Sequence, residues 1–191
     1  MVNNINPGTF PAIFLDRDGV INHNRDDYVK SWEEFAFLPD ALGALTRLSD
    51  SSYKVVIITN QSPIGRGLLS ISQLDDIHKH MLGEIRSKGG RVDGIYFCPH
   101  LPSDGCECRK PKPGLLYQAA HDMTIDLSQS FLIGDGVSDI EAAINAGCRP
   151  LLVLTGRGRD ELGRLPPKLR YSCDVFPDLS AAVDWLLDNH T

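Results

Sequence analysis

The chain has 191 residues, enough to bury the core of one domain, and its 42% hydrophobic and 23% charged residues are typical of a globular protein. Its 25 acidic and 19 basic side chains give a net charge of -6, without a long basic run, which argues against nucleic acid as a partner. No apolar stretch approaches the roughly 20 residues that span a bilayer, and residues 1–9 lack the basic and apolar parts of a signal peptide. We therefore expect a cytoplasmic protein with a single domain over residues 1–191 and an N-terminal tail over residues 1–10.

An apolar run near the N-terminus, residues 12–15, leads directly into Asp16-Arg17-Asp18-Gly19. A short apolar run that ends in charge and glycine is typical of a strand buried on both faces. Two carboxylates one residue apart converge only if the backbone turns, and they then repel each other unless a cation or a shared proton lies between them. Taken alone, the same pattern also fits a polar strand end with solvated acids.

Apolar runs alternate with helical patterns along the rest of the chain. In order, we expect a loop over 22–32, a helix from 40, a strand over 53–58 and a loop over 63–67. A helix capped by Ser70 or Ser72 and ended by Gly89-Gly90 comes next, then a strand over 95–98, a loop to 108, a helix from Pro113 and a strand over 131–135. The chain continues with a helix over 138–146, a strand over 150–154, a surface connection over 155–170, an edge strand within 171–176 and a helix over 179–187. This alternation predicts an α/β fold, a doubly wound parallel sheet covered on both faces. No gap between these elements is long enough for a large cap domain.

Polar side chains follow the ends of four predicted strands. Asp16 and Asp18 follow the first strand, Thr59 the second, and Asp135 the fourth, while Lys110 lies just beyond the loop after the third. Carboxyl ends of parallel strands lie along one edge of a sheet, so we expect these side chains to meet in one crevice.

These residue types fit phosphoryl transfer. Asp16, Asp18 and Asp135 supply the hard oxygen ligands that Mg²⁺ prefers, while Thr59 and Lys110 can donate to a phosphoryl group. Asp16 could attack phosphorus once cations mask the repulsion, and Asp18 could protonate the leaving oxygen and later activate water. Taken one at a time, Thr59 also fits a strand end, Lys110 a solvated lysine and Asp135 a turn residue. Their joint placement favours catalysis.

A cluster of metal-ligating residues occupies the loop after the third strand. Its members are Cys98, His100, Cys106 and Cys108. Three sulfurs and one imidazole suffice for tetrahedral Zn²⁺ and leave no open position, so we expect a structural ion that folds residues 98–108 and holds Arg109 and Lys110 in place. Reduced cysteines that merely pack are the alternative, but the intervening residues are polar or proline and cannot form a core. An odd count of five cysteines also favours a metal site in a reducing compartment over disulfides.

The motifs resemble those of the haloacid dehalogenase superfamily of phosphohydrolases. The resemblance runs from about residue 12 to residue 155 and rests, in this order, on Asp16-x-Asp18-Gly19, Thr59-Asn60-Gln61, Lys110 and Gly134-Asp135-x-x-x-Asp139. It implies a Mg²⁺-dependent enzyme with Asp16 as nucleophile and Asp18 as acid and base. It also implies that Thr59 and Lys110 steady the phosphoryl group.

More narrowly, the stretch after the second strand and the Cys/His loop resemble the zinc-loop branch of this superfamily. The resemblance implies removal of the 7-phosphate of a heptose 1,7-bisphosphate through an aspartyl-phosphate, in the synthesis of nucleotide-activated heptose. Pro63 and Gly65 depart from the branch pattern, and Gly136 replaces a lysine, so the sugar and its anomer stay open. The substrate-binding residues implied are Arg17, Asn24, Tyr28, Asn60, Gln61, Ser62, Arg66 and Arg109.

Other functions remain open on the sequence. A phosphatase of histidinol phosphate or of another small sugar phosphate shares the zinc loop or the motifs. A phospho-acceptor signalling domain also has acids, a threonine and a lysine, but it places its acceptor after a middle strand and has no zinc loop. A zinc-stabilised binding module with inert acids is the last alternative. We expect a monomer that binds a small sugar bisphosphate, with neither nucleic acid nor membrane as a partner.

Overall fold

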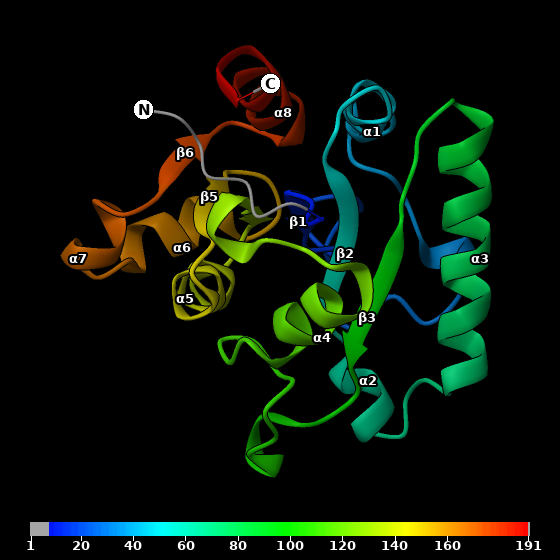
Figure 1. Ribbon diagram of the computed structural model, residues 1–191. Helices are drawn as coiled ribbons and strands as arrows, with labels where there is room; N and C mark the ends of the chain where they lie inside the picture. The colour runs from blue at the N-terminus through cyan, green and yellow to red at the C-terminus, as the bar shows by residue number, and fades with distance from the viewer. Residues whose placement is uncertain (1–7, 191) are drawn as a thin grey trace.

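The computed structural model describes residues 8–190, which form a six-stranded sheet in the order β3-β2-β1-β4-β5-β6 (Figure 1). Every neighbouring pair of strands is parallel. The strands are β1 (Ala12–Leu15), β2 (Lys54–Asn60), β3 (Gly94–Cys98), β4 (Phe131–Gly134), β5 (Arg149–Val153) and β6 (Asp174–Phe176). The prediction of a doubly wound parallel α/β sheet is therefore confirmed.

Helices cover both faces of this sheet. They are α1 (Ala41–Leu48), α2 (Ser62–Gly65), α3 (Ile71–Ser87), α4 (Gly114–Met123), α5 (Val137–Ala146), α6 (Gly158–Arg164), α7 (Pro167–Arg170) and α8 (Leu179–His190). Buried side chains of α1, α3 and α8 pack on one face of the sheet, and those of α4 and α5 pack on the other. Between the described elements the connections carry no inserted cap domain, as predicted.

The central strand shows why its sequence is apolar throughout. Ile13 and Leu15 point into the core beneath α1, α3 and α8, whereas Ala12 and Phe14 point into the core beneath α4 and α5. All four are fully buried because successive side chains of a strand alternate between faces. The first polar residue after the strand, Asp16, therefore emerges at the carboxyl edge of the sheet.

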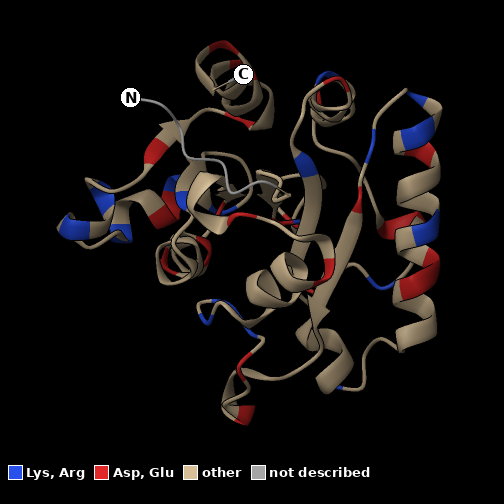
Figure 2. Cartoon of the chain, in the orientation of Figure 1, with Lys and Arg blue, Asp and Glu red and all other residues tan. Residues whose placement is uncertain are grey.

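Helix α3 begins where its capping residues predict. Ser70 accepts a hydrogen bond from the backbone N–H of Gln73, and the Gln73 side chain accepts one from the Ser70 backbone, which completes a capping box. Of the two expected caps, Ser70 is thus the one used. Acidic and basic residues are interspersed along α3 (Figure 2).

The prediction of a surface connection over residues 155–170 is wrong, because α6 and α7 lie there. Leu165 is buried against Leu152 and Ile140, and it anchors these short helices to the sheet. Several glycines and Pro166-Pro167 interrupt the helical pattern, which is why the sequence does not predict these two helices. A similar difference occurs at residues 63–67, where the expected loop is largely the short helix α2.

The expected N-terminal tail is only partly described, since residues 1–7 lie outside the described residues. Phe10 is hydrogen-bonded to the segment after α4. Its backbone N–H donates to the carbonyl of Thr124 at 3.0 Å, and its carbonyl accepts from the backbone N–H of Asp126 at 2.9 Å. Among the described helices, none is both long and apolar enough to cross a membrane.

Candidate active site

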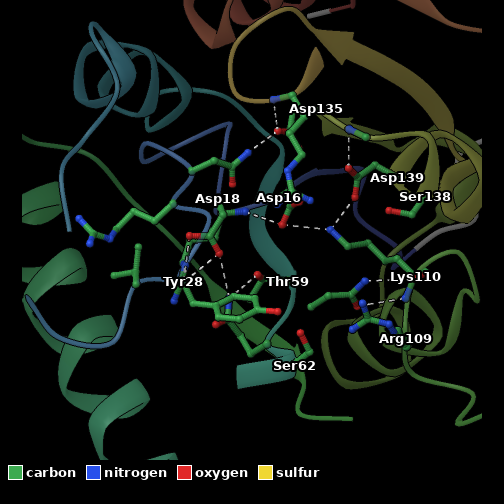
Figure 3. A pocket seen from close by; sticks show the side chains of 18 of the residues that line it. Asp16, Asp18, Tyr28, Thr59, Ser62, Arg109, Lys110, Asp135, Ser138 and Asp139 are labelled. Atoms are coloured by element: carbon green, nitrogen blue, oxygen red, sulfur yellow. Dashed lines mark hydrogen bonds and ion pairs between the residues drawn. The ribbon is translucent and has the colours of Figure 1, made fainter. Parts of the chain in front are cut away.

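A crevice of about 310 Å³ opens at the carboxyl edge of the sheet (Figure 3). The side chains expected to meet there all line it, namely Asp16, Asp18, Thr59, Lys110 and Asp135. They come from the ends of β1, β2 and β4 and from the segment after the Cys/His loop. The parallel topology brings together residues separated by more than a hundred positions.

Lys110 lies at the floor of the crevice with only 3% of its surface exposed. Its Nζ is 3.0 Å from Oδ1 of Asp16 and 2.5 Å from Oδ1 of Asp139, and it donates to the carbonyl of Ile58 at 2.8 Å. Burial alone would lower the pKa of Lys110, but Asp139 and Asp16 more than offset this and raise it. Lys110 therefore keeps its positive charge beside the predicted nucleophile.

Three carboxylates gather around this ammonium. Oxygens of Asp16, Asp135 and Asp139 lie within 4.8 Å of one another, so this trio could hold a metal ion. Burial and the neighbouring acids raise the pKa of Asp16 to about 8, against the opposing effect of Lys110. Burial, followed by Asp139, raises the pKa of Asp135 to about 6. Three acids facing one ammonium leave an excess of negative charge that suits a divalent cation with oxygen ligands.

This trio differs from the expected metal set, in which Asp18 stood in place of Asp139. The Asp18 carboxylate lies outside this trio and accepts hydrogen bonds from Arg17 at 2.8 and 3.0 Å, from Asn22 at 2.9 Å and from Gln61 at 3.0 Å, so its metal-binding role stays a prediction. Burial would raise the pKa of Asp18, but Arg17 and these hydrogen bonds lower it overall. Asp18 is thus held as a carboxylate at one side of the crevice.

Arg17, which the sequence predicts to bind substrate, is largely engaged by other residues of the site. Only 1% of its surface is exposed, and its guanidinium is directed at Asp18 and at His78 on α3. Arg17 is among the residues that line the crevice, with its guanidinium engaged by these two neighbours.

Asp135 is fixed by its surroundings. One of its oxygens, Oδ2, accepts from the Asn24 side chain and from the Arg157 backbone, both at 2.8 Å. Gly19 and Gly156, both with positive φ, pack so closely around this oxygen that a Cβ at either would collide with it. Within the described residues, the other oxygen, Oδ1, accepts no hydrogen bond and remains available to a ligand. Asn24, expected at the substrate, lines the crevice but bonds this carboxylate.

Thr59 and Asn60 end β2, Gln61 follows it, and the three side chains have distinct partners. The Gln61 amide donates to the Thr59 hydroxyl at 2.9 Å and to Asp18 at 3.0 Å, so it links these two groups. Asn60 clamps the backbone of Lys110, since its amide donates to the Lys110 carbonyl and its carbonyl accepts from the Lys110 N–H, both at 3.1 Å. The resemblance predicts that Asn60 and Gln61 bind the substrate. In the structure, Asn60 is hydrogen-bonded to Lys110, and Gln61 is hydrogen-bonded to Thr59 and Asp18.

The remaining expected substrate residues line the outer crevice: Tyr28, Ser62, Arg66 and Arg109. Tyr28 has a positive φ of 67°, a conformation uncommon for a bulky residue, at the edge of the site. Arg109 donates to the carbonyl of His100 in the Cys/His loop at 3.3 Å, which ties its position to that loop.

Eight lining residues were not among the expected site residues: Arg25, Val29, Pro102, Gly136, Ser138, Asp139, Arg157 and Glu161. Asp139 could have been predicted from the sequence, because it lies one helical turn after Asp135 in the motif Gly134-Asp135-x-x-x-Asp139. Arg157 and Glu161 lie in the stretch interpreted as a surface connection, so no pattern pointed to them.

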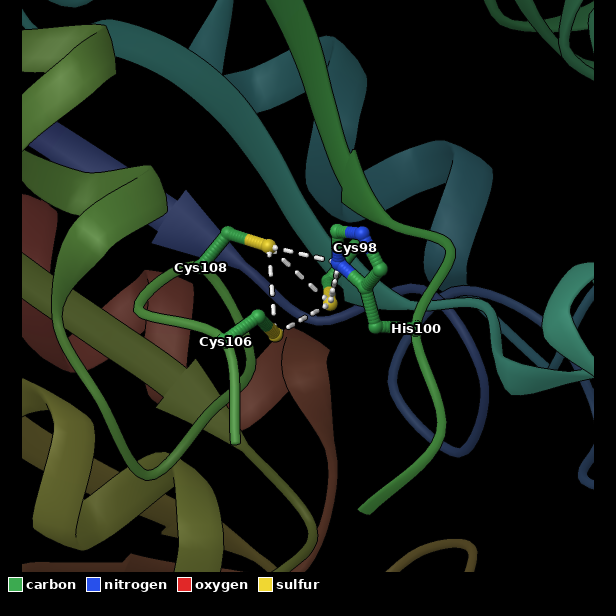
Figure 4. Close-up of side chains that lie close together, drawn as sticks. All are labelled: Cys98, His100, Cys106 and Cys108. Carbon is green, nitrogen blue, oxygen red and sulfur yellow. Dashed lines mark hydrogen bonds between the residues drawn. The ribbon is translucent and has the colours of Figure 1, made fainter. Parts of the chain in front are cut away.

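The Cys/His loop brings its four expected ligands together (Figure 4). The Sγ atom of Cys98 is 3.6 Å from that of Cys106 and 3.2 Å from that of Cys108, and Nδ1 of His100 is 3.2 Å from Sγ of Cys108. A tetrahedral zinc ion with bonds of about 2.3 Å to sulfur requires sulfurs roughly 3.8 Å apart, so small adjustments suffice. Burial and the adjacent thiols raise the pKa of Cys98 to about 12, so its thiolate form needs a nearby cation.

Comparisons with known proteins agree with this site. A family model described as HAD-hydrolase-like matches residues 107–182. The chain is 42% identical to the D-glycero-beta-D-manno-heptose-1,7-bisphosphate 7-phosphatase of Pseudomonas aeruginosa, over 92% of this chain and 97% of that protein. It is 45% identical to the protein of the same name from Bordetella bronchiseptica, with the same coverage.

A solved structure shares the fold. The D,D-heptose 1,7-bisphosphate phosphatase of B. bronchiseptica, complexed with magnesium and phosphate, superposes with a TM-score of 0.87 at 43% identity, over 93% of this chain and 98% of that one. The parallel sheet, the acid cluster and these matches define the class of haloacid dehalogenase-like hydrolases. Within that class, the chain belongs to the family of D-glycero-beta-D-manno-heptose-1,7-bisphosphate 7-phosphatases.

Proposed function

We propose that this chain is a Mg²⁺-dependent phosphatase that removes the 7-phosphate of D-glycero-D-manno-heptose 1,7-bisphosphate. The observation that supports this chemistry is the buried Lys110 ammonium between Asp16 and Asp139 in the crevice. The substrate is supported by relatives of that name that are 42% and 45% identical over nearly the whole chain. The proposed role is one step in the synthesis of nucleotide-activated heptose.

In the first step, an oxygen of Asp16 forms a bond to phosphorus while the bond between phosphorus and the sugar oxygen breaks. Lys110 reduces the repulsion between the carboxylate and the phosphoryl group, and the Thr59 hydroxyl donates to a phosphoryl oxygen. Asp18 gives its proton to the leaving sugar oxygen. The negative phosphoryl group next to Asp18 favours the protonated acid that this transfer needs, against the lowering effect of Arg17.

In the second step, Asp18 takes a proton from water, and the resulting nucleophile attacks the phosphorus of the aspartyl-phosphate. The bond between phosphorus and Asp16 breaks, inorganic phosphate leaves, and the Asp16 carboxylate is restored. The low pKa of Asp18 suits this base role directly, because the side chain is ionised once the sugar has left.

Asp16, Asp135 and Asp139 are the residues that would hold Mg²⁺, with Asp139 shared with Lys110. When bound, the ion supplies positive charge to the phosphoryl oxygens and to the nucleophile. Asn24 and the Arg157 backbone keep Asp135 oriented toward it.

The outer crevice would recognise the rest of the sugar bisphosphate. Tyr28, Ser62, Arg66 and Arg109 face the volume beyond the phosphoryl site, and the two arginines can pair with a second phosphate. The zinc loop would fix Arg109 and Lys110. We also propose that the chain acts as a single-domain monomer in the cytoplasm, where its free cysteines stay reduced, with no nucleic acid or membrane as a partner.

A phosphate-release assay in the presence of Mg²⁺ tests the substrate. It compares the heptose 1,7-bisphosphate with fructose 1,6-bisphosphate and histidinol phosphate, followed by identification of which phosphate has left the heptose. We expect the largest kcat/KM for the heptose and a product that keeps its 1-phosphate. Fastest turnover of histidinol phosphate would contradict the assignment, and no turnover of any ester would contradict the enzyme itself.

A further inference from the structure

A histidine beneath the site has no part in the chemistry described above. His78 lies on α3 with 7% of its surface exposed, and its Nε2 is 3.3 Å from Nη1 of Arg17. No residue of α3 lines the described crevice, so this contact is how the helix reaches the catalytic centre. A buried polar side chain in contact with a buried cation calls for a physical explanation.

The contact defines the state of the imidazole. An arginine nitrogen can only donate, so Nε2 of His78 must accept and the ring proton must be on Nδ1. Burial and then the neighbouring Arg17 lower the pKa of His78 to about 3, which agrees with a neutral ring. The ring also lies edge-on to Phe97 of β3, with centroids 6.3 Å apart. His78 is therefore a fixed acceptor at a fixed position.

Arg17 depends on this acceptor for its orientation. Its Nη1 contacts His78, its Nη2 donates to both oxygens of Asp18, and its Nε is buried without a partner among the described residues. Two contacts on different nitrogens fix the plane of a guanidinium, whereas one contact leaves it free to rotate. Loss of the imidazole acceptor would therefore loosen the carboxylate that Arg17 holds.

We propose that His78 is a positioning residue that acts through Arg17 to aim the Asp18 carboxylate at the leaving-group oxygen. This inference rests on the proposed role of Asp18 as acid and base. It predicts a defect specific to proton transfer. Binding of the substrate and of Mg²⁺ should be unaffected, because His78 contacts neither the outer crevice nor the acid trio.

Leaving-group dependence separates this role from a general structural one. The alkyl ester of the heptose needs a proton on its leaving oxygen, whereas the nitrophenolate of p-nitrophenyl phosphate leaves without one. His78→Leu removes the acceptor at similar size, and His78→Gln supplies a new acceptor at similar reach. Arg17→Lys, which keeps the charge but cannot contact both partners, is a second test that leaves α3 intact. His80→Leu is the matched control, since His80 lies on the same helix, exposed and stacked on Trp32.

The experiment measures kcat and KM of each variant on both esters, with melting temperature and Mg²⁺ affinity alongside. For His78→Leu and Arg17→Lys, we expect kcat/KM on the heptose bisphosphate to fall about tenfold to hundredfold, part of what a positioned acid contributes. The loss on p-nitrophenyl phosphate should be much smaller, KM and Mg²⁺ affinity should stay unchanged, and His78→Gln should recover most of the rate.

Equal losses of kcat/KM on the two esters, a change in KM alone, or wild-type rates in both variants would overturn the positioning role while leaving the proposed function intact. Failure of the wild type to hydrolyse either ester would overturn the proposed function and the role of His78 together. An equal loss in His80→Leu would assign the effect to α3 as a whole.

Discussion

The two clusters of this protein that could each hold a metal ion are held together by different means. The acid trio of Asp16, Asp135 and Asp139 lies at the ends of β1 and β4 and in the first turn of α5, where the buried sheet fixes each backbone. In the Cys/His cluster only Cys98 belongs to a strand, and the other ligands lie in the polar loop that follows β3. The fold positions the acid trio, whereas the Cys/His cluster would itself order the loop that carries it.

The difference shows what each metal has to do. Around Asp16 the folded chain already fixes the ligands, so a cation there adds charge and chemistry but little shape. The loop over residues 98–108 has no core of its own, so an ion bound by its cluster would supply free energy that orders it. Lys110 joins the two sites, because it lies two residues after Cys108 and contacts Asp16. Disturbing either cluster should therefore affect catalysis, but with different effects on folding.

The largest effect should come from Asp16→Asn, which removes the nucleophile and leaves the fold. We expect kcat to fall by roughly 10⁴- to 10⁶-fold, as when other covalent nucleophiles are removed. The melting temperature without metal should be maintained or raised, because a buried carboxylate with a raised pKa is lost. Phosphate release and calorimetry measure both. Asp184→Asn on α8 is the control, and activity retained by Asp16→Asn would contradict the nucleophile assignment.

Lys110→Met should damage both rate and stability. The substitution leaves Asp16 and Asp139 buried without their shared cation, and breaking a buried pair in this way costs about 3–5 kcal/mol of unfolding free energy. Urea unfolding measures this loss, which Mg²⁺ should partly restore by replacing the missing charge. Lys112→Met, which removes an exposed pair with Glu107, should be nearly neutral. Similar stability of the two variants would show that Lys110 does not hold the trio.

The Cys106→Ser variant tests whether zinc binding by the Cys/His loop supports catalysis. We expect the purified protein to lose most of its bound zinc, from about one ion per chain, and the rate to fall about tenfold to hundredfold as Arg109 and Lys110 lose their support. Hydrogen exchange should rise over residues 98–110 and stay low in the sheet. Cys173→Ser, outside the cluster, should keep zinc and activity. Full activity without zinc would separate the loop from catalysis.

Asn24→Ala should weaken Mg²⁺ binding without affecting the loop. Its amide orients Asp135, and loss of such a partner typically lowers metal affinity about tenfold to hundredfold. Titration calorimetry with Mg²⁺ alone provides the measurement, and zinc content should not change. Asn189→Ala at the exposed end of α8 serves as control. An unchanged Mg²⁺ affinity would show that Asp135 needs no such support.

The smallest effect should be a pH dependence of stability that arises from Asp16 and Asp135. Burial raises the pKa of Asp16 to about 8 and that of Asp135 to about 6, so between pH 3.8 and about 8 the folded chain holds protons that the unfolded chain releases. Without metal, this contribution to stability falls as pH rises through that window. Mg²⁺ takes the place of the protons and should raise the melting temperature more at the alkaline end. An equal increment across the window would contradict the raised pKa values.

Much of the fold could be predicted because local pattern and global position agree. The apolar run of residues 12–15 is buried on both faces in the structure, and Ser70 caps α3 as a capping box requires. Helices α6 and α7 could not be predicted, because their stabilising contact, Leu165 on Leu152, depends on tertiary packing. Short helices interrupted by glycine and proline carry too little periodicity of their own.

The sequence revealed which residues gather at the site but not their partners. Sheet topology was enough to bring Asp16, Lys110 and Asp135 together. Whether Asp18 or Asp139 joins them depends on the side-chain directions set by Arg17 and Gln61, which no spacing encodes. The clustering of Cys98, His100, Cys106 and Cys108 was predictable because cysteine and histidine at close spacing have few other uses in a polar loop.

The most direct test of the central claim is to trap the phosphoryl group on the chain. Asp18→Asn should slow release of the aspartyl-phosphate, and acid-quenched protein can then be digested and analysed by mass spectrometry during turnover of the heptose bisphosphate with Mg²⁺. We predict that Asp16 alone gains the mass of one phosphoryl group, and that Mg²⁺ removal abolishes the label. Turnover without label, or a label on any other residue, would contradict the account.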